Sequence, residues 1–209
     1  MENKQKNEIE IKITMDSQNL NKLLELAVIK DNTILDSKRN LKLKNIYYDT
    51  ENKKLAAKKV VYRVRITNEN EFEATIKADK EVVGGYSERM EYNVALTNAK
   101  PTLEGFKEEG FPLDLEELLA GEKLKPLFTV LVNRKRSLIQ ITASTLIEMA
   151  IDCGEIVAGS KKVAIDEVEF ELIKGKKEDL IAFTNSLKAN IVFKAEKKSK
   201  FKRGLELIK

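Results

Sequence analysis

The chain has 209 residues, of which 38 are Lys or Arg and 34 are Asp or Glu, with no histidine and one cysteine. This length suits one sizeable domain or two small ones. A single cysteine excludes an internal disulfide framework and a zinc site made of several cysteines. The absence of histidine excludes Ser-His-Asp and Cys-His catalysis, histidine metal ligands and histidine pH switches. Acid-base or metal chemistry must therefore use Asp, Glu, Lys, Arg, Tyr or water.

The positive and negative charges are nearly balanced, and the net charge is +4. A nucleic-acid-binding arm would carry a larger basic excess, so no nucleic-acid partner is expected. Apolar runs are too short for a transmembrane helix or a signal segment. We therefore expect a cytoplasmic protein that has no membrane partner.

In chain order, the commonest pattern is strict alternation of apolar and polar residues, the period of a β-strand. It predicts strands at residues 8–13, 41–49, 61–66, 73–77, 89–94, 131–136, 146–152 and 167–172. Helical spacing predicts helices across 20–27, with Ser17 as the N-cap, and across 113–119 and 180–187. Turns are expected at 68–70, at 84–85 and across 154–159. The lysine-rich stretch 194–203 has the composition of a solvated end.

One face of strand after strand is almost purely ionic, with successive same-face residues about 7 Å apart. The sets that share a face are Glu8, Glu10 and Lys12; Arg63 and Arg65; Glu73 and Lys77; Arg89 and Glu91; Arg134 and Arg136; Glu148 and Asp152; and Glu167, Glu169 and Glu171. An open sheet with a solvated ionic face is one geometry that accommodates them. A closed barrel that holds the charges in its lumen is the other, and it would bind a metal ion and a polyanion together.

The choice of charged residues favours the barrel. Arginine occupies the basic positions that pair within one strand, and arginine suits bidentate contacts with phosphate. The acidic residues gather on the first predicted strand and the last three, and carboxylates are the oxygen ligands that Mg²⁺ or Mn²⁺ prefers.

Several segments, in order along the chain, resemble the CYTH superfamily, the triphosphate tunnel metalloenzymes. Glu8-Ile-Glu-Ile-Lys12 is similar to its Glu-x-Glu-x-Lys signature, and Arg63-Val-Arg65 to its Arg-x-Arg strand. Segment 84–96 resembles the bacterial inorganic triphosphatase branch. The other matching segments are 47–50, 75–77, 126–128, 147–154, 167–172 and 199–204.

The resemblance implies an α+β fold, with an eight-stranded antiparallel barrel closed into a tunnel, flanking helices and one domain over residues 1–209. It implies metal-dependent hydrolysis of inorganic triphosphate to pyrophosphate and phosphate. The substrate-binding residues it implies are Lys12, Arg63, Arg65, Lys77, Arg89, Arg134, Arg136, Lys200 and Arg203. The ligands implied for Mg²⁺ or Mn²⁺ are Glu8, Glu10, Glu91, Asp152, Glu169 and Glu171. The catalytic candidates are Lys12, Glu10, Glu148 and Asp152, with Lys12 placing the attacking water.

Alternatives stay open for single residues. Glu167 is either a metal ligand or only a charge partner in the lumen. A one-residue slip of strand register would move Arg134 and Arg136 to the outer surface. Arg203 could cap the tunnel mouth instead of binding substrate. Asn93 stands where the family often has a glutamate, so one lumen carboxylate is missing.

Other functions also stay open. A class IV adenylate cyclase would need a site for adenine and the ribose 3′-hydroxyl. A thiamine triphosphatase or a nucleoside triphosphatase is a further possibility; thiamine recognition would favour aromatic stacking, and only 6% of the residues are aromatic. A non-catalytic binder of polyphosphate or nucleotides would not need the carboxylates. The expected partner is a small polyanion such as inorganic triphosphate, ATP or thiamine triphosphate, bound by a monomer or homodimer.

Overall fold

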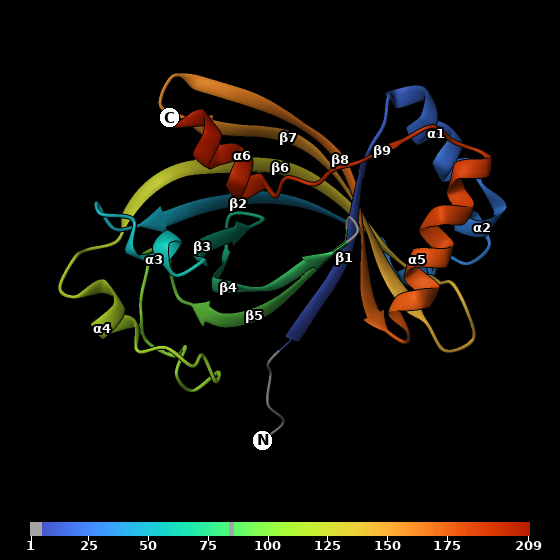
Figure 1. Cartoon of the computed structure of the whole chain (residues 1–209). Coiled ribbons are helices and arrows are strands. Elements are labelled where there is room, and N and C mark those ends of the chain that lie inside the picture. The colour runs from blue at the N-terminus through green and yellow to red at the C-terminus, as the bar shows by residue number, and fades with distance from the viewer. Residues whose placement is uncertain (1–5, 84–85) are drawn as a thin grey trace.

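A curved antiparallel sheet forms the body of the molecule (Figure 1). The computed structural model describes residues 6–83 and 86–209, and the side chains of residues 8–78 and 90–209. The strands are β1 (Lys6–Thr14), β2 (Arg39–Asp49), β3 (Val60–Thr67), β4 (Glu71–Val83), β5 (Tyr86–Leu96), β6 (Lys125–Gln140), β7 (Leu146–Ala158), β8 (Lys161–Lys174) and β9 (Lys194–Ala195). Their order in the sheet is β5-β4-β3-β2-β6-β7-β8-β1-β9. The expected antiparallel sheet with flanking helices is therefore confirmed.

The strand β1 has neighbours on both sides. It pairs with β8 from Glu10 to Ile13, and with β5 from Lys6, opposite Glu91, to Ile11, opposite Tyr86. The two-residue strand β9 adds a further pairing at the end of β1. The expected count of eight strands is therefore corrected to nine, because the C-terminal segment runs back alongside β1 before the last helix.

Alternation along each strand separates a charged inner face from an apolar outer face, as the pleat of a strand requires. In β3, Arg63 and Arg65 line the cavity inside the curved sheet, whereas Tyr62 and Val64 are completely buried on the opposite side. The inner space enclosed by the sheet is called the lumen below. The apolar core of this protein thus lies outside the sheet, between its strands and the helices.

The helices cover the outer face and one end of the sheet. They are α1 (Ser17–Glu25), α2 (Ala27–Lys30), α3 (Lys54–Ala57), α4 (Leu115–Leu119), α5 (Lys177–Ser186) and α6 (Lys200–Leu207), with short 3-10 turns at Leu35–Ser37 and Leu187–Ala189. Figure 1 shows α1, α2 and α5 grouped at one end of the sheet and α4 at the other. None of the helices in the described ranges has the length and apolar character needed to cross a membrane.

Three apolar clusters hold these elements together. The first joins α1 and α5 to β1, β7 and β8 around Ile13 and Phe170. The second joins α3 and α4 to β3, β4 and β5, with Tyr62 and Phe106 completely buried. The third lies on β2, β6, β7 and β8, where Phe128 packs beside α6. Each fully buried large side chain of this kind contributes roughly 1.5–3 kcal/mol.

Three local expectations were wrong. The N-cap of α1 is Asp16, not Ser17, because the Asn19 amide donates to Asp16 Oδ1 over 2.7 Å. Of the turn expected across 154–159, only Gly159 lies in a turn; Gly154 lies within β7, where it pairs with Val132 and Ile165. The lysine-rich stretch 194–203 contains β9 and the start of α6. The hairpin expected at 84–85 lies outside the described residues.

Candidate functional site

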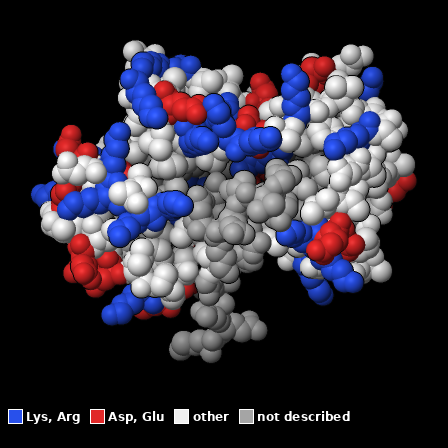
Figure 2. All heavy atoms as spheres, in the orientation of Figure 1, with Lys and Arg blue, Asp and Glu red and all other residues white. Residues whose placement is uncertain are grey.

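The lumen contains a cavity of about 540 Å³ lined by charged side chains from most of the long strands. Its walls alternate acidic and basic groups because the strands present their charged faces inward. Figure 2 shows basic and acidic side chains mingled on one face of the molecule. Such a cavity must either pair its charges internally or bind ions, because a buried charge without a partner is costly.

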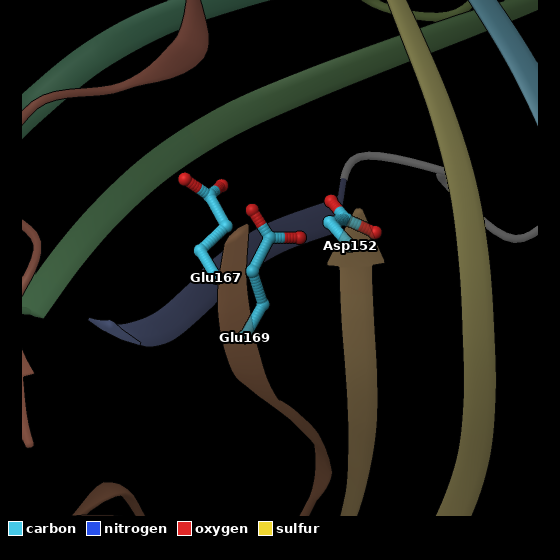
Figure 3. Close-up of side chains that lie close together, drawn as sticks. All are labelled: Asp152, Glu167 and Glu169. Carbon is cyan, nitrogen blue, oxygen red and sulfur yellow. The ribbon is translucent and has the colours of Figure 1, made fainter. Parts of the chain in front are cut away.

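Three carboxylates converge on one wall of the lumen. Asp152 lies on β7 and Glu167 is its register partner on β8, two residues before Glu169. Each offers an oxygen atom within 4.8 Å of the others (Figure 3). In the part of the chain that the structure describes, this is the one group of acidic residues close enough to share a cation.

Two cations already contact this acidic cluster, defined as Asp152, Glu167 and Glu169. Lys200 Nζ lies 2.7 Å from Asp152 and 2.9 Å from Glu169, and also contacts Glu167. Arg134 donates from Nη2 to Glu169 over 2.5 Å and forms a two-bond pair with Asp152. Burial alone would raise the pKa of Glu169, but Lys200 and Arg134 outweigh it and hold the pKa well below the usual range.

The helix α6 brings Lys200 to the acidic cluster. Ser199 caps its first turn by accepting from the Lys202 amide over 3.1 Å. Gly204 lets the helix lie close to β6, because a β-carbon there would come within 2.2 Å of the Phe128 ring. The Phe201 ring packs 5.9 Å from the same ring, measured between centroids. Lys200 thus reaches the lumen on a helix that composition alone could not distinguish from a solvated tail.

Glu167 has a second basic partner in the last helix. Arg203 Nη1 lies 3.0 Å from Glu167 Oε2. Burial raises the pKa of Glu167 above its ordinary value, and Lys200 only partly counteracts this effect. In the structure Glu167 is a charge partner of these two cations. Arg203 does not line the cavity and instead contacts Glu167 and the Ala164 carbonyl.

A second group of charges joins β1 to β4 and β5. Lys77 Nζ lies 2.7 Å from Glu8 and 2.7 Å from Glu91, so it bridges two carboxylates. Burial would lower the pKa of Lys77, but Glu8 and Glu91 outweigh it and raise that pKa. Beside them, Lys12 Nζ lies 2.7 Å from Glu10. Burial would likewise lower the pKa of Lys12, but Glu10 and Glu169 outweigh it and raise that pKa.

Two arginines of β3, of which Arg63 is buried and Arg65 half-buried, lack such partners in the described ranges. Arg63 is 6% exposed and donates from Nη2 to the Thr75 hydroxyl over 3.0 Å. Arg65 donates from Nε to the Asn45 side-chain oxygen over 2.8 Å. Neither makes an ion pair with a carboxylate in the described ranges. Burial, Arg63 and Arg134 lower the pKa of Arg65 to about 10. Glu73, the register partner of Arg65 on β4, only partly counteracts this effect.

Among the remaining site residues, Arg136, Glu148 and Glu171 line the cavity. Arg136 is partly exposed and pairs with Glu148 over 3.0 Å. The side chain of Arg89 lies outside the described residues. Arg134 and Arg136 both face the cavity, so the register slip does not occur.

The metal ligands implied by the resemblance do not form one cluster in the structure. Asp152 and Glu169 lie together with Glu167, whereas Glu8 and Glu91 meet at Lys77. The role of Asn45 as a partner of Arg65 was missed. The sequence contained one indication of it: Asn45 is the single polar residue on the face of β2 that points into the lumen, where the others are apolar or aromatic.

Comparison with known proteins agrees with this geometry. The family model for the CYTH domain matches residues 6–205. A Haemophilus influenzae protein named inorganic triphosphatase is 34% identical over 206 residues, which is 98% of this chain and 56% of that protein. The chain thus spans about half the length of this curated relative.

Two solved structures share the fold. A candidate adenylyl cyclase from Hippeastrum, described as having a dominant triphosphatase activity, superposes with a TM-score of 0.63 at 16% identity, covering 95% of each chain. A candidate adenylate cyclase from Bacillus halodurans has a TM-score of 0.55 at 18% identity, covering 95% of this chain and 97% of the other. At these identities the likeness concerns the fold alone.

Proposed function

Because the chain belongs to the CYTH domain family, we propose that it hydrolyses inorganic triphosphate to pyrophosphate and phosphate within the lumen. The observation that carries the proposal is the pair Arg63 and Arg65, a buried and a half-buried cation that make no ion pair with a carboxylate in the described ranges. A buried cation needs an anion, and guanidinium groups suit phosphate oxygens. The named activity of the Haemophilus influenzae relative supports the choice of triphosphate.

We propose that the long strands β1 to β8 close into a tunnel around the substrate, as one domain over residues 1–209. The pairing of β1 with both β8 and β5 supports closure. Exclusion of bulk water from such a tunnel would strengthen each contact between a guanidinium group and a phosphate oxygen. Lys12, Lys77 and the arginines Arg63, Arg65, Arg134 and Arg136 would then hold the phosphates in line, and Lys200 would close the end near α6.

The acidic cluster fits a hard divalent cation, for which we propose Mg²⁺ or Mn²⁺, because it offers several carboxylate oxygens within one small volume. Asp152 and Glu169 would hold the ion, with Glu171 two residues further along β8, Glu10 beside it on β1, and Glu8 and Glu91 around Lys77. A bound divalent ion would neutralise phosphate charge and lower the pKa of a water molecule. Phosphoryl transfer depends mainly on positioning and charge neutralisation, so the lack of histidine is no obstacle.

The test is phosphate release from inorganic triphosphate, ATP and thiamine triphosphate, each with Mg²⁺, with Mn²⁺ or with EDTA, while cyclic AMP is measured in the ATP samples. We expect fast release from inorganic triphosphate that EDTA abolishes. The variant Arg65→Ala should lose most of this activity. Arg39→Ala is the matched control, because Arg39 is exposed and its guanidinium contacts only the carbonyls of Asp36 and Lys38. Cyclic AMP without phosphate, or no turnover of triphosphate, would contradict the proposal.

A further inference from the structure

A chain of hydrogen bonds crosses three neighbouring strands at the wall of the lumen. The register places Arg63 of β3 opposite Thr75 of β4, and Thr75 opposite Asn93 of β5. Arg63 Nη2 donates to the Thr75 hydroxyl over 3.0 Å, and that hydroxyl donates to Asn93 Oδ1 over 2.8 Å. Asn93 Nδ2 in turn donates to Glu91 Oε1 over 3.1 Å.

The direction of every bond in this chain is set by its two ends. A guanidinium group only donates and a carboxylate only accepts. The Thr75 hydroxyl therefore accepts from Arg63, and its single proton goes to Asn93, since the other acceptor, Glu73, is 3.5 Å away. Asn93 must turn its oxygen toward Thr75 and its amide nitrogen toward Glu91. Only a side chain with an acceptor and a donor can complete the chain at position 93.

The Arg63 guanidinium is held at one end and free at the other. Its Nε has no hydrogen-bond partner, and in the described part of the chain it is the only buried side-chain nitrogen or oxygen in that condition. Thr75 is fully buried and does not line the cavity, whereas Arg63 and Asn93 do. A buried donor without an acceptor is costly, so the orientation of Arg63 at the cavity wall depends on the bond that its Nη2 makes with Thr75.

A charged residue at position 93 would disturb this arrangement. A carboxylate in place of the Asn93 amide would bring a second negative charge next to Glu91, where Asn93 Nδ2 now lies 3.1 Å from Glu91 Oε1. The one lysine at Glu91, Lys77, is already shared with Glu8. The neutral amide therefore suits Glu91 on one side and Thr75 on the other.

We propose that Asn93 is a positioning residue, which acts through Thr75 to hold the Arg63 guanidinium in the orientation that binds the phosphate anion. This inference rests on the proposed function, because the anion concerned is the triphosphate bound in the lumen. Asn93 does not itself need to contact the substrate, since its oxygen and its amide nitrogen are both engaged within the protein.

The experiment measures calorimetric binding of inorganic triphosphate to the full chain in EDTA, where hydrolysis does not interfere. We expect Asn93→Ala and Thr75→Val each to weaken binding about tenfold, the loss that follows when a charged hydrogen bond of about 1.4 kcal/mol is misplaced. Thr75→Ser keeps the hydroxyl and should restore the affinity. Asn133→Ala is the matched control, because Asn133 is an exposed asparagine on β6.

A double-mutant cycle separates positioning from direct contact. If Asn93 acts only through Arg63, then Asn93→Ala should change the affinity less than twofold when Arg63→Ala is already present. A further tenfold loss in that background would overturn the positioning role, as would unchanged affinity in the single Asn93→Ala variant. If the unmodified chain binds no triphosphate, the proposed function fails and the inference with it. Binding by the unmodified chain that Asn93→Ala leaves unchanged would overturn the inference alone.

Discussion

Arg134 of β6 donates two parallel hydrogen bonds to Asp152 of β7, from Nε to Oδ1 and from Nη2 to Oδ2, each 2.6 Å long. The two residues are register partners on adjacent strands, so the backbone pairing itself aligns the guanidinium with the carboxylate. Asp152 is 1% exposed and also contacts Lys200. A two-bond pair of this kind is among the strongest charge-assisted contacts in proteins. Much of the order of the acidic cluster therefore depends on one carboxylate.

Replacing that carboxylate with a neutral amide should affect both stability and activity. In Asp152→Asn, Arg134 and Lys200 lose a shared anion, and breaking a buried pair costs about 3 kcal/mol. Urea unfolding should show this loss, and the rate of phosphate release should fall by more than a hundredfold. The comparison variant is Glu155→Gln, whose partner Lys162 is exposed, and it should lose less than 1 kcal/mol. Equal unfolding curves for the two variants would contradict this account of the cluster.

Removing an unpaired cation should have the opposite effect on stability. Arg65 is half-buried near Arg63 and Arg134, Glu73 only partly compensates them, and its side chain donates to Asn45. In Arg65→Met, the desolvation cost of the guanidinium disappears while much of the apolar stem volume remains. We expect the free energy of unfolding to rise by about 1 kcal/mol, while triphosphate binding falls at least tenfold. A variant that is less stable than the unmodified chain would show that Arg65 is compensated within the protein.

Acid should weaken the contribution of Glu91 to stability. Burial alone would raise the pKa of Glu91, but Lys77 and Arg63 outweigh it and hold the pKa well below its ordinary value. A carboxylate with a depressed pKa in the folded state binds fewer protons there than in the unfolded chain. Its stabilisation is therefore present above the ordinary glutamate pKa, near 4.3, and is lost as the pH falls through the lower, folded value.

Urea unfolding of the unmodified chain and Glu91→Gln at several pH values tests this expectation. The unmodified chain should be the more stable at pH 7, and the difference should shrink as the pH falls below about 4. Glu206→Gln serves for comparison, because Glu206 lies on the surface and pairs with the exposed Lys198. A difference for Glu91→Gln that grows toward low pH would have the wrong sign.

The close approach of α6 to β6 should be sensitive to a single methyl group. In Gly204→Ala, the new β-carbon would come within 2.2 Å of the Phe128 ring, so the helix must shift. Lys200 would then leave the acidic cluster, and we expect at least tenfold slower turnover with a folded sheet. Circular dichroism reports the sheet, and phosphate release reports the site. Lys202→Ala is the control, since Lys202 is an exposed residue of the same helix. Full activity in Gly204→Ala would show that the position of Lys200 is unimportant.

Much of the charged lumen could be predicted because strand alternation is a local property. Each residue of the pair Arg63 and Arg65 follows the same two-residue period, so both must face one side of β3. The resemblance to a tunnel-forming family then predicted that the sheet curves with this side facing inward. Local patterns could not reveal β9, because two residues carry no measurable period. Nor could they reveal α6, because its lysines are typical of a solvated end of the chain. Only the structure shows that Gly204 and Phe201 pack against Phe128.

The sequence by itself determined which residues are charged, which strand face they share, and that histidine and cysteine-rich chemistry is excluded. Only the tertiary structure decided how the charges pair: Lys200 joins Asp152 from 48 positions away in the chain, whereas Arg63 and Arg65 have no carboxylate partner in the described ranges. The physical reason is that alternation is fixed by the geometry of one strand, while pairing depends on register between strands and on where a helix docks. Such ion pairs join residues that are far apart in the chain, so neither composition nor the local pattern predicts them.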